Sequence, residues 1–369
     1  MRARHVRHSS SSRQPFAIKI APHRALHTMP SMSTVTIKDV ARVARVNPAT
    51  VSKALRGLPG KVSQETRERI EQVARELGYR HNAVAATLRT RRSDLIGVIV
   101  PDLGNPLFGP LVQGLERQLR EGGWMSVVVQ PPEDPSSRRA VITTLAARQV
   151  AGLIISSAES DDPMLGAAAE MGIPLVLVNR GLNERRFSCV VNDDRESVML
   201  VLDHLRALGH TRIAHLAGPM SSSTGRGRRQ AFEALMSKIP GAQGTVVDAS
   251  AFTREAGFAA MQSLLARRRA RRATAVFAAN DLIAVGALDA LRQAGLRVPE
   301  DISVVGHNDM PLVDMIAPPL TTVRIPLARM SDHAAALLRE HLADPSLPPT
   351  QRVLTPTLVV RASTAPPLE

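Results

Sequence analysis

From residue 95 onward, short runs of aliphatic residues alternate with longer amphipathic segments, and this alternation restricts the fold more than any other feature. The expected strands are residues 95–100, 126–130, 153–155, 175–178, 213–216, 275–277 and 303–305. The expected helices between them are residues 110–121, 138–148, 194–208, 226–236, 254–267 and 281–293. Such alternation is typical of parallel sheets covered by helices on both faces. The length allows two such lobes, with a ligand site at the carboxyl ends of the strands, in the cleft between the lobes.

Residues 35–79 follow a different pattern, in which three short helices each begin at a recognisable cap. The caps are Thr36, which has capping-box spacing to Asp39, Asn47, which precedes Pro48, and Ser63. Two short helices joined by a tight turn and followed by a third predict a helix-turn-helix.

The second of these helices is the one expected to enter the major groove of DNA. Its apolar face carries Val51, Ala54 and Leu55. Its opposite face carries Ala49, Thr50, Ser52, Lys53 and Arg56. A generic three-helix bundle with a solvated basic face is the alternative that the spacing leaves open.

The positive charge of the chain is concentrated in its N-terminal quarter. The net charge is +14, yet residues 93–369 hold 28 basic and 28 acidic residues. Residues 1–34 hold six Lys or Arg and no acid, and residues 35–92 hold thirteen against five. A basic segment beside a neutral globule is typical of polyanion binding. Aromatic residues make up only 2% of the chain, which argues against recognition by base stacking.

Residues 1–34 lack apolar periodicity, and we expect a disordered basic extension. No apolar stretch of about 7–15 residues follows the basic start, so a secretory signal is not supported. The acid-free composition has features of an organelle transit peptide. We favour an extension upstream of the real start of the protein, because Met29 and Met32 lie just before the first expected helix.

Membrane, metal and catalytic functions find little support in the residues. No stretch approaches the roughly 18 uninterrupted apolar residues of a membrane span. Cys189 is the only cysteine, which excludes an intrachain disulfide and a cysteine-cluster metal site and favours a reducing cytoplasm. It lies in a predicted strand, where a buried thiol is expected rather than a nucleophile. His204 and His210 flank a helix end and are expected to cap it. We therefore expect neither a cofactor nor an enzyme.

Several motifs resemble those of the LacI/GalR family of transcriptional regulators. The N-terminal motifs are IKDVARVARVNPATVSKAL (residues 37–55), VSQETRERI (62–70) and ELGY (76–79). Further landmarks are IGVIVPDLGNPLF (96–108), HLRALGH (204–210), AND (279–281), VVGHND (304–309) and PPLTTV (318–323). The chain departs from the family pattern at Asn47, where serine is usual, and at Arg45, where glycine is common in the turn.

The resemblance implies how such a chain contacts DNA. Residues 82–89 alone are too short for a stable helix and read as a linker, but in this family the segment folds as a hinge helix on specific DNA. Paired hinges of a dimer would lie in the minor groove, where Leu88 would kink a base step. Lys53 would contact guanine and Ala49 a thymine methyl group. The expected DNA-binding residues are Thr36, Pro48, Ala49, Thr50, Ser52, Lys53, Arg56, Asn82, Ala85, Leu88 and Arg89.

For the neutral body, the resemblance implies a periplasmic-type sugar-binding fold with three crossings between the lobes, near Asn192, Val323 and residues 345–350. Arg228 matches the arginine with which the family holds ligand oxygens. The expected effector-binding residues are Asn105, Phe108, Arg228, Phe252, Asn280, Asp281, Asn308 and Asp309. Core packing is an open alternative for the two phenylalanines, as is a strand-end cap for the two aspartates. Asn308 replaces an aspartate common in relatives, which would ease the binding of an anionic effector.

The expected fold is thus an N-terminal all-α helix-turn-helix DNA-binding domain plus an α/β two-lobed periplasmic-binding-protein-like effector domain. The expected segments are a basic extension (1–34), the helix-turn-helix domain (35–81), a hinge helix and linker (82–93), the effector-binding and dimerisation domain (94–363) and a tail (364–369). The N-lobe would comprise residues 94–191 and 323–345, and the C-lobe residues 193–322 and 350–363.

The expected function is sequence-specific DNA binding that regulates transcription, with repression as the favoured mode and control by a sugar or related metabolite. The expected partners are a pseudopalindromic double-stranded operator, that effector and a second copy in a homodimer, a tetramer also being compatible, with no membrane partner. The expected location is the bacterial cytoplasm, at the nucleoid. The alternative is a solute-binding protein without DNA function, which the body alone would support.

Overall fold

The computed structural model describes residues 35–55, 62–79, 93–157, 159, 162–182, 186–267 and 273–368. The chain divides into two compact units, Met1–Ala86 and Thr87–Glu369. Within the described ranges, no helix is both long and apolar enough to cross a membrane.

The described part of the first unit, residues 35–55 and 62–79, contains three helices around a small apolar core. They are α1 (Ile37–Val43), α2 (Pro48–Leu55) and α3 (Gln64–Glu76). The core consists of Val40, Ala41, Ala44, Val51, Ala54, Ile70, Val73 and Ala74. The caps are those expected from the sequence: the Asp39 carboxylate accepts the backbone N–H of Thr36 (3.0 Å), Asn47 Oδ1 accepts that of Ala49 (2.9 Å), and Ser63 Oγ accepts that of Thr66 (3.4 Å).

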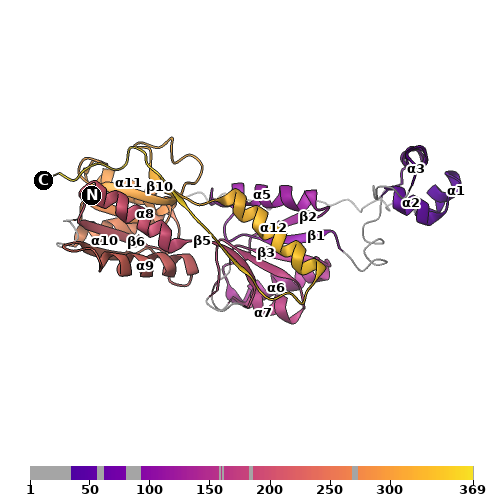
Figure 1. Cartoon of the computed structure of the whole chain (residues 1–369), viewed down its shortest axis with the longest axis horizontal. Coiled ribbons are helices and arrows are strands. Elements are labelled where there is room, and N and C mark those ends of the chain that lie inside the picture. Colours follow the sequence, from indigo (N-terminus) through magenta and orange to yellow (C-terminus); the bar gives the residue numbers. More distant parts are fainter. Residues whose placement is uncertain are drawn as a thin grey trace, which may run out of the picture. The chain divides into compact units, whose positions relative to one another are not determined.

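The second unit contains two α/β lobes, each built on a six-stranded sheet (Figure 1). The N-lobe strands are β1 (Leu95–Ile99), β2 (Met125–Val129), β3 (Gly152–Ile155), β4 (Leu175–Val178), β5 (Ser188–Asn192) and β11 (Gln351–Leu354). The N-lobe helices are α5 (Phe108–Glu121), α6 (Pro135–Ala147), α7 (Pro163–Glu170) and α12 (Leu327–Ala343). The strand order is β11-β5-β4-β3-β1-β2, with every pairing parallel.

The C-lobe repeats this plan with one antiparallel edge. Its strands are β6 (Arg212–Ala217), β7 (Gln243–Asp248), β8 (Ala275–Ala278), β9 (Ser303–Asn308), β10 (Thr321–Arg324) and β12 (Thr357–Val359). Its helices are α8 (Asp194–Ala207), α9 (Ser223–Met236), α10 (Arg254–Ala266) and α11 (Asp281–Gln293). The order is β12-β10-β9-β8-β6-β7, in which only β12 runs antiparallel to its neighbour.

Helices cover both faces of each sheet (Figure 1). In the N-lobe, α5 and α12 contribute to one apolar core and α6 and α7 to another. In the C-lobe, α10 and α11 pack on one face of the sheet and α8 and α9 on the other. Strands buried on two faces need apolar residues at nearly every position, which explains the continuous aliphatic runs in the sequence.

Two of the expected lobe boundaries need correction. Residues 351–354 were expected in the C-lobe, but β11 pairs with β5 of the N-lobe, in the register Gln351 to Cys189. The third crossing therefore lies between Leu354 and Thr357. The second crossing follows Arg324 rather than Val323, because β10 stays hydrogen-bonded to β9 through Arg324.

The C-terminal segment is part of the C-lobe rather than a separate tail. His204 Nε2 lies 3.0 Å from Thr364 Oγ1, and His210 Nε2 lies 2.9 Å from the carbonyl oxygen of Ala365. The expectation that these two histidines cap a helix end is therefore wrong, since their rings bind this segment. Burial lowers the pKa of both rings.

Candidate functional site

Helix α2 presents a polar face to solvent because its other face is held in the core. Val51 and Ala54 are buried against α1 and α3. The predicted DNA contacts Pro48, Ala49 and Lys53 are exposed, and Thr50 and Ser52 are half-buried. The helix begins at proline, and Asn47 accepts the N–H of Ala49, so the first turn is well defined. The structure thus brings these five predicted residues together on or beside one helix.

The turn before α2 requires a left-handed residue, which Arg45 supplies. Its φ is +53°, and the N–H of the next residue, Val46, donates to the carbonyl of Ala41 at 3.0 Å. Glycine adopts this conformation most readily, which explains why glycine is common in this turn of related sequences. The turn forms with arginine, and Arg45 is exposed.

The other predicted DNA contacts are placed less completely. Thr36 is exposed at the start of α1, where its hydroxyl donates to Asp39 at 2.7 Å. That hydrogen bond is the leading cause of the lowered pKa of Asp39. Arg56 and the predicted hinge residues Asn82, Ala85, Leu88 and Arg89 lie outside the described residues.

In the second unit, a cavity of ≈ 920 Å³ lies between the lobes. Its lining comes mainly from loops that follow the carboxyl ends of parallel strands, as expected for this class of sheet. The N-lobe polar side chains that line it are Asp102, Asn105, Gln130, Glu133, Arg138, Ser157, Glu159, Asp162, Asn179 and Arg180. The C-lobe polar side chains are Ser221, Ser222, Thr224, Arg226, Arg228, Ser250, Thr253, Asn280 and Asn308.

Six of the eight predicted effector residues line this cavity. They are Asn105, Phe108, Arg228, Phe252, Asn280 and Asn308. Arg228 is 3% exposed, donates from Nε to Asp194 at 2.9 Å and from Nη1 to the carbonyl of Ala279. Phe108 also packs into the N-lobe core, whereas Phe252 is half-buried beside the Arg180 guanidinium, 5.8 Å from ring centroid to Cζ. The structure is therefore compatible with both interpretations of the phenylalanines, as residues that line the effector cavity and as residues that pack in a core.

The two predicted aspartates do not line the cavity. Asp281 is fully buried, accepts the Thr322 hydroxyl at 2.6 Å and accepts the N–H of Met310 at 2.8 Å. Burial raises its pKa to about 7. Asp309 binds Arg324 and Arg361, at 2.6 and 2.7 Å. Both carboxylates hold C-lobe segments together, so their assignment to the effector site is wrong.

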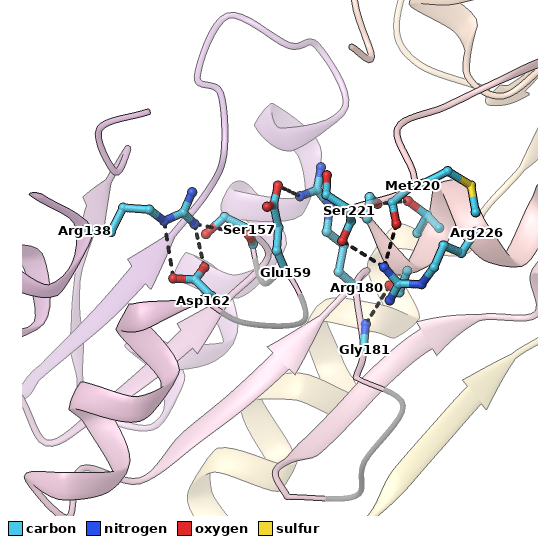
Figure 2. A network of polar contacts seen from close by, with 12 residues as sticks. Arg138, Ser157, Glu159, Asp162, Arg180, Gly181, Met220, Ser221 and Arg226 are labelled. Atoms are coloured by element: carbon cyan, nitrogen blue, oxygen red, sulfur yellow. Dashed lines mark hydrogen bonds and ion pairs between the residues drawn. The ribbon is translucent and has the colours of Figure 1, made fainter. Parts of the chain in front are cut away.

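Several cavity residues were missed because sequence spacing does not reveal them. Arg138 of α6 forms an ion pair with the buried Asp162 at 2.6 Å, and a guanidinium N–H donates to the carbonyl of Ser157 at 3.4 Å (Figure 2). Arg180 and Ser157 follow β4 and β3 directly. The position of Arg180 and Ser157 just after predicted strands was the one feature of the sequence that could have identified them.

The lobes also contact each other beside the cavity. The Gly181 N–H of the N-lobe donates to Ser223 Oγ at the start of α9, at 3.2 Å. Nearby, Arg226 donates to the carbonyls of Met220 and Ser221, at 2.7 and 3.0 Å (Figure 2). The bond from Gly181 to Ser223 places the N-terminal end of α9 against the loop after β4, so a change in lobe angle must alter that bond, whereas the Arg226 bonds lie within the C-lobe.

The thiol of Cys189 is buried in β5, as the sequence predicts. A buried strand thiol in an apolar core has little access to a substrate.

Comparison with known proteins agrees with both units. A sequence model described as "Bacterial regulatory proteins, lacI family" matches residues 36–82, and one described as "Periplasmic binding protein-like domain" matches residues 202–364. The chain is 35% identical to the HTH-type transcriptional regulator MalR of Streptomyces coelicolor, across 90% of this chain and 97% of that protein. It is 33% identical to the HTH-type transcriptional regulator GalR of Escherichia coli, across 90% and 96%.

Solved structures are similar over the same span. The lac repressor dimer bound to operator and the anti-inducer ONPF has a TM-score of 0.78 and 28% identity, across 90% of this chain and 99% of that chain. A complex of the transcriptional regulator CelR with cellobiose has a TM-score of 0.67 and 32% identity, across 89% and 99%.

Proposed function

Because the chain belongs to the LacI family of bacterial transcriptional regulators, which are not enzymes, we propose that it is a repressor that binds a pseudopalindromic operator as a homodimer. An effector in the cleft between the lobes controls this binding, in the cytoplasm where the DNA lies. The observation that carries the proposal is the exposed polar face of α2, held outward by its buried Val51 and Ala54.

The proposed contacts follow from the chemistry of that face. Lys53 donates to guanine acceptors in the major groove, and the Ala49 methyl packs on a thymine methyl. Thr50, Ser52 and Arg56 contact phosphates and fix the register. Two copies related by a two-fold axis place two such helices on successive major-groove turns, which demands a pseudopalindromic site. Leu88 of each copy then kinks the central step, with Asn82, Ala85 and Arg89 beside it.

The proposed effector is a sugar-like metabolite. A regulator of similar structure was solved with cellobiose and another with ribose, and the cavity here is lined by the Arg and Asn side chains that bind hydroxylated ligands. A ligand that favours one lobe angle shifts the population toward that angle. The bond from Gly181 to Ser223 spans the lobes and is one contact through which this shift is felt.

Selection from a randomised duplex library tests the DNA-binding proposal. The purified chain should enrich a palindromic sequence, and its affinity for that duplex should fall steeply with salt. Lys53→Ala should lose about tenfold in discrimination between the selected duplex and a scrambled one. Arg206→Gln, which removes an exposed charge from α8 of the C-lobe, is the control and should bind like the natural chain.

Failure to enrich any duplex, in the presence or absence of candidate effectors, would contradict the proposal. That result would favour the alternative of a solute-binding protein without DNA function. An enriched site without two-fold symmetry would contradict the homodimer part alone.

A further inference from the structure

Arg180 is a buried guanidinium whose charge has a weak partner. It follows β4, and its side chain is 12% exposed in the cavity lining. Glu159 approaches at 4.0 Å, which is beyond hydrogen-bond distance (Figure 2). On its other side lies the ring of Phe252. Within the described part of the chain, no carbonyl or carboxylate oxygen accepts a hydrogen bond from this guanidinium.

The other arginines of the cavity differ in this respect. Arg138 donates to Asp162, Arg226 to the Met220 carbonyl, and Arg228 to Asp194 and the Ala279 carbonyl. Each of these guanidinium groups therefore already donates hydrogen bonds to protein oxygens. Burial lowers the pKa of Arg180, because its charge has been removed from water without full compensation by protein groups. A ligand oxyanion would supply that compensation.

Most amide side chains around the cavity share one orientation, in which the oxygen accepts a hydrogen bond from the protein. Asn105 Oδ1 accepts the N–H of Leu107 (3.1 Å), and Gln130 Oε1 accepts that of Leu103 (2.9 Å). Each oxygen therefore already accepts one hydrogen bond, whereas the NH₂ groups have no partner among the described residues and are open to a ligand.

The C-lobe amides follow the same rule. Asn280 Oδ1 accepts the N–H of Ile283 at 2.9 Å, while its NH₂ makes one long contact of 3.4 Å to the Phe252 carbonyl. Asn308 Oδ1 lies 3.0 Å from Nδ1 of the buried His307, whose N–H donates to it. Asn179 is the exception, since neither end of its amide has a partner among the described residues.

The carboxylates of this cavity are paired, exposed or already beside Arg180. Asp162 is paired with Arg138, Asp102 and Glu133 are exposed, and Glu159 lies 4.0 Å from Arg180. Ser157 Oγ is buried with no hydrogen-bond partner in the described structure, and a hydroxyl can donate. A neutral polyol brings as many O–H donors as oxygens and carries no charge to compensate the Arg180 guanidinium. An oxyanion brings acceptors only.

We propose that the effector is an acid, a small hydroxylated molecule whose carboxylate or phosphate is bound by Arg180 where the lobes meet. Asn308 and Ser157 donate to the same molecule. The inference rests on the proposed function for the cleft and narrows it from sugars in general to their acids.

Ligand-dependent thermal unfolding of the full chain tests this proposal. The probes are D-glucose, D-glucuronate and D-glucose 6-phosphate, which share a ring and differ in charge. Inorganic phosphate and glycolate serve as minimal anions, compared with chloride at equal ionic strength. At least one anion should raise the Tm by about 3 °C over chloride, and glucose should raise it less. A response to glucuronate and glycolate assigns a carboxylate, and a response to the phosphates assigns a phosphate.

Two variants and a control make the result specific to the site. Arg180→Met keeps the bulk and apolar stem but should abolish the response to anions. Asn308→Asp keeps the shape and places a negative charge in the cavity, so it should weaken anion binding by about tenfold. Arg206→Gln removes a positive charge outside the cavity and should respond like the natural chain.

The proposal is overturned if no anion raises the Tm above that in chloride, if glucose stabilises as well as its acids, or if Arg180→Met responds as the natural chain does. The affinity of the effector-free protein for its selected duplex is measured in parallel. DNA binding with no preference for anions rejects this inference and leaves the proposed function standing, whereas failure to bind any duplex, both with and without candidate effectors, rejects the proposed function.

Discussion

The two lobes share an architecture but differ in what their sheets bury. In the N-lobe, the central strands β1, β3 and β4 carry only aliphatic residues and glycine. In the C-lobe, β6 and β9 bury His215 and His307, and Asp281 is buried at the start of α11. On the N-lobe side of the cleft, loops and long side chains therefore lie over strands that are wholly apolar. On the C-lobe side, the cleft residues lie next to buried polar side chains of the sheet and of α11.

This difference separates binding from stability. Asp281 of the C-lobe is fixed by the Thr322 hydroxyl and the Met310 N–H, so removing one of these groups leaves a buried partner unsatisfied. On the N-lobe wall, Arg138 and Asp162 are paired, but the Arg180 guanidinium and Ser157 Oγ contact few other polar groups. We therefore expect substitutions of Asp281 or Thr322 to destabilise the fold and those of Arg180 or Ser157 to alter mainly ligand binding.

The largest expected effect concerns the closeness of helix packing in the C-lobe. A Cβ at Gly286 of α11 would overlap the carbonyl oxygen of Arg254 in α10, whereas a Cβ at Gly166 of α7 in the N-lobe meets no atom within 4 Å. Gly286→Ala should therefore lower the free energy of unfolding by about 3 kcal/mol, and Gly166→Ala should raise it by about 0.5–1 kcal/mol. Urea unfolding measures both, and equal effects would contradict the difference in packing.

Acid should destabilise the C-lobe through its buried histidines. Burial lowers the pKa of His215 from 6.5 to about 4, so the ring is neutral in the folded protein while the unfolded chain takes up a proton near pH 6.5. The stabilisation is complete above pH 6.5 and is lost as the pH falls toward 4, by about 3 kcal/mol. Asp281 contributes in the opposite direction, because burial raises its pKa to about 7 and the folded protein therefore binds this proton at a higher pH than the unfolded chain does. Urea unfolding between pH 7 and 4.5 therefore measures the His215 loss as the difference between the natural chain and a variant without the imidazole ring.

A variant without the titrating group isolates that effect. His215→Phe keeps a ring stacked on Phe277 but cannot bind a proton, so its stability should fall less steeply with pH. A slope equal to that of the natural chain would assign the acid sensitivity to other groups, such as His307, whose pKa burial also lowers.

Two buried hydroxyls provide a matched pair between the lobes. Thr322 in the C-lobe donates to Asp281, whereas Ser157 Oγ in the N-lobe has no partner in the described structure. Thr322→Val should lower the free energy of unfolding by about 2 kcal/mol, and Ser157→Ala should change it by less than about 0.5 kcal/mol. Thermal unfolding without ligand checks both, and a large loss for Ser157→Ala would show that the N-lobe wall is also part of a network.

The smallest effect extends the comparison to the first unit, whose core is smaller than that of either lobe. Arg45 has a φ of +53°, so Arg45→Gly should stabilise this unit by about 0.5–1 kcal/mol. Arg42→Gly, within α1, should instead destabilise it by about 1 kcal/mol. Hydrogen exchange of the α1–α3 amides in the full chain measures both effects. If Arg45→Gly does not stabilise the unit, the turn at Arg45 is not strained.

Elements with local signals were predicted closely from the sequence. The expected helix at residues 281–293 coincides with α11, and the caps at Asn47 and Ser63 form as expected. The expected strand list omitted β7, β10, β11 and β12, three of which lie at sheet edges, and it omitted β5, where a strand was expected only around Cys189. These segments are short and partly polar, so they lack a clear strand signal in the sequence and become strands only by pairing with residues far away in the chain. That pairing also moved the boundary between the lobes.

The sequence by itself determined the cap chemistry, the two-faced α2 and the charge separation between the units, because each depends on residues a few positions apart. It also pointed to the polar residues at strand ends. Only the tertiary structure decided which of these charges are already neutralised. Asp281 and Asp309 turned inward to partners about 15 to 50 positions away, and among the described residues Arg180 was left with only the Glu159 carboxylate at 4.0 Å. Neutralisation depends on distances between residues far apart in the chain, which folding alone sets.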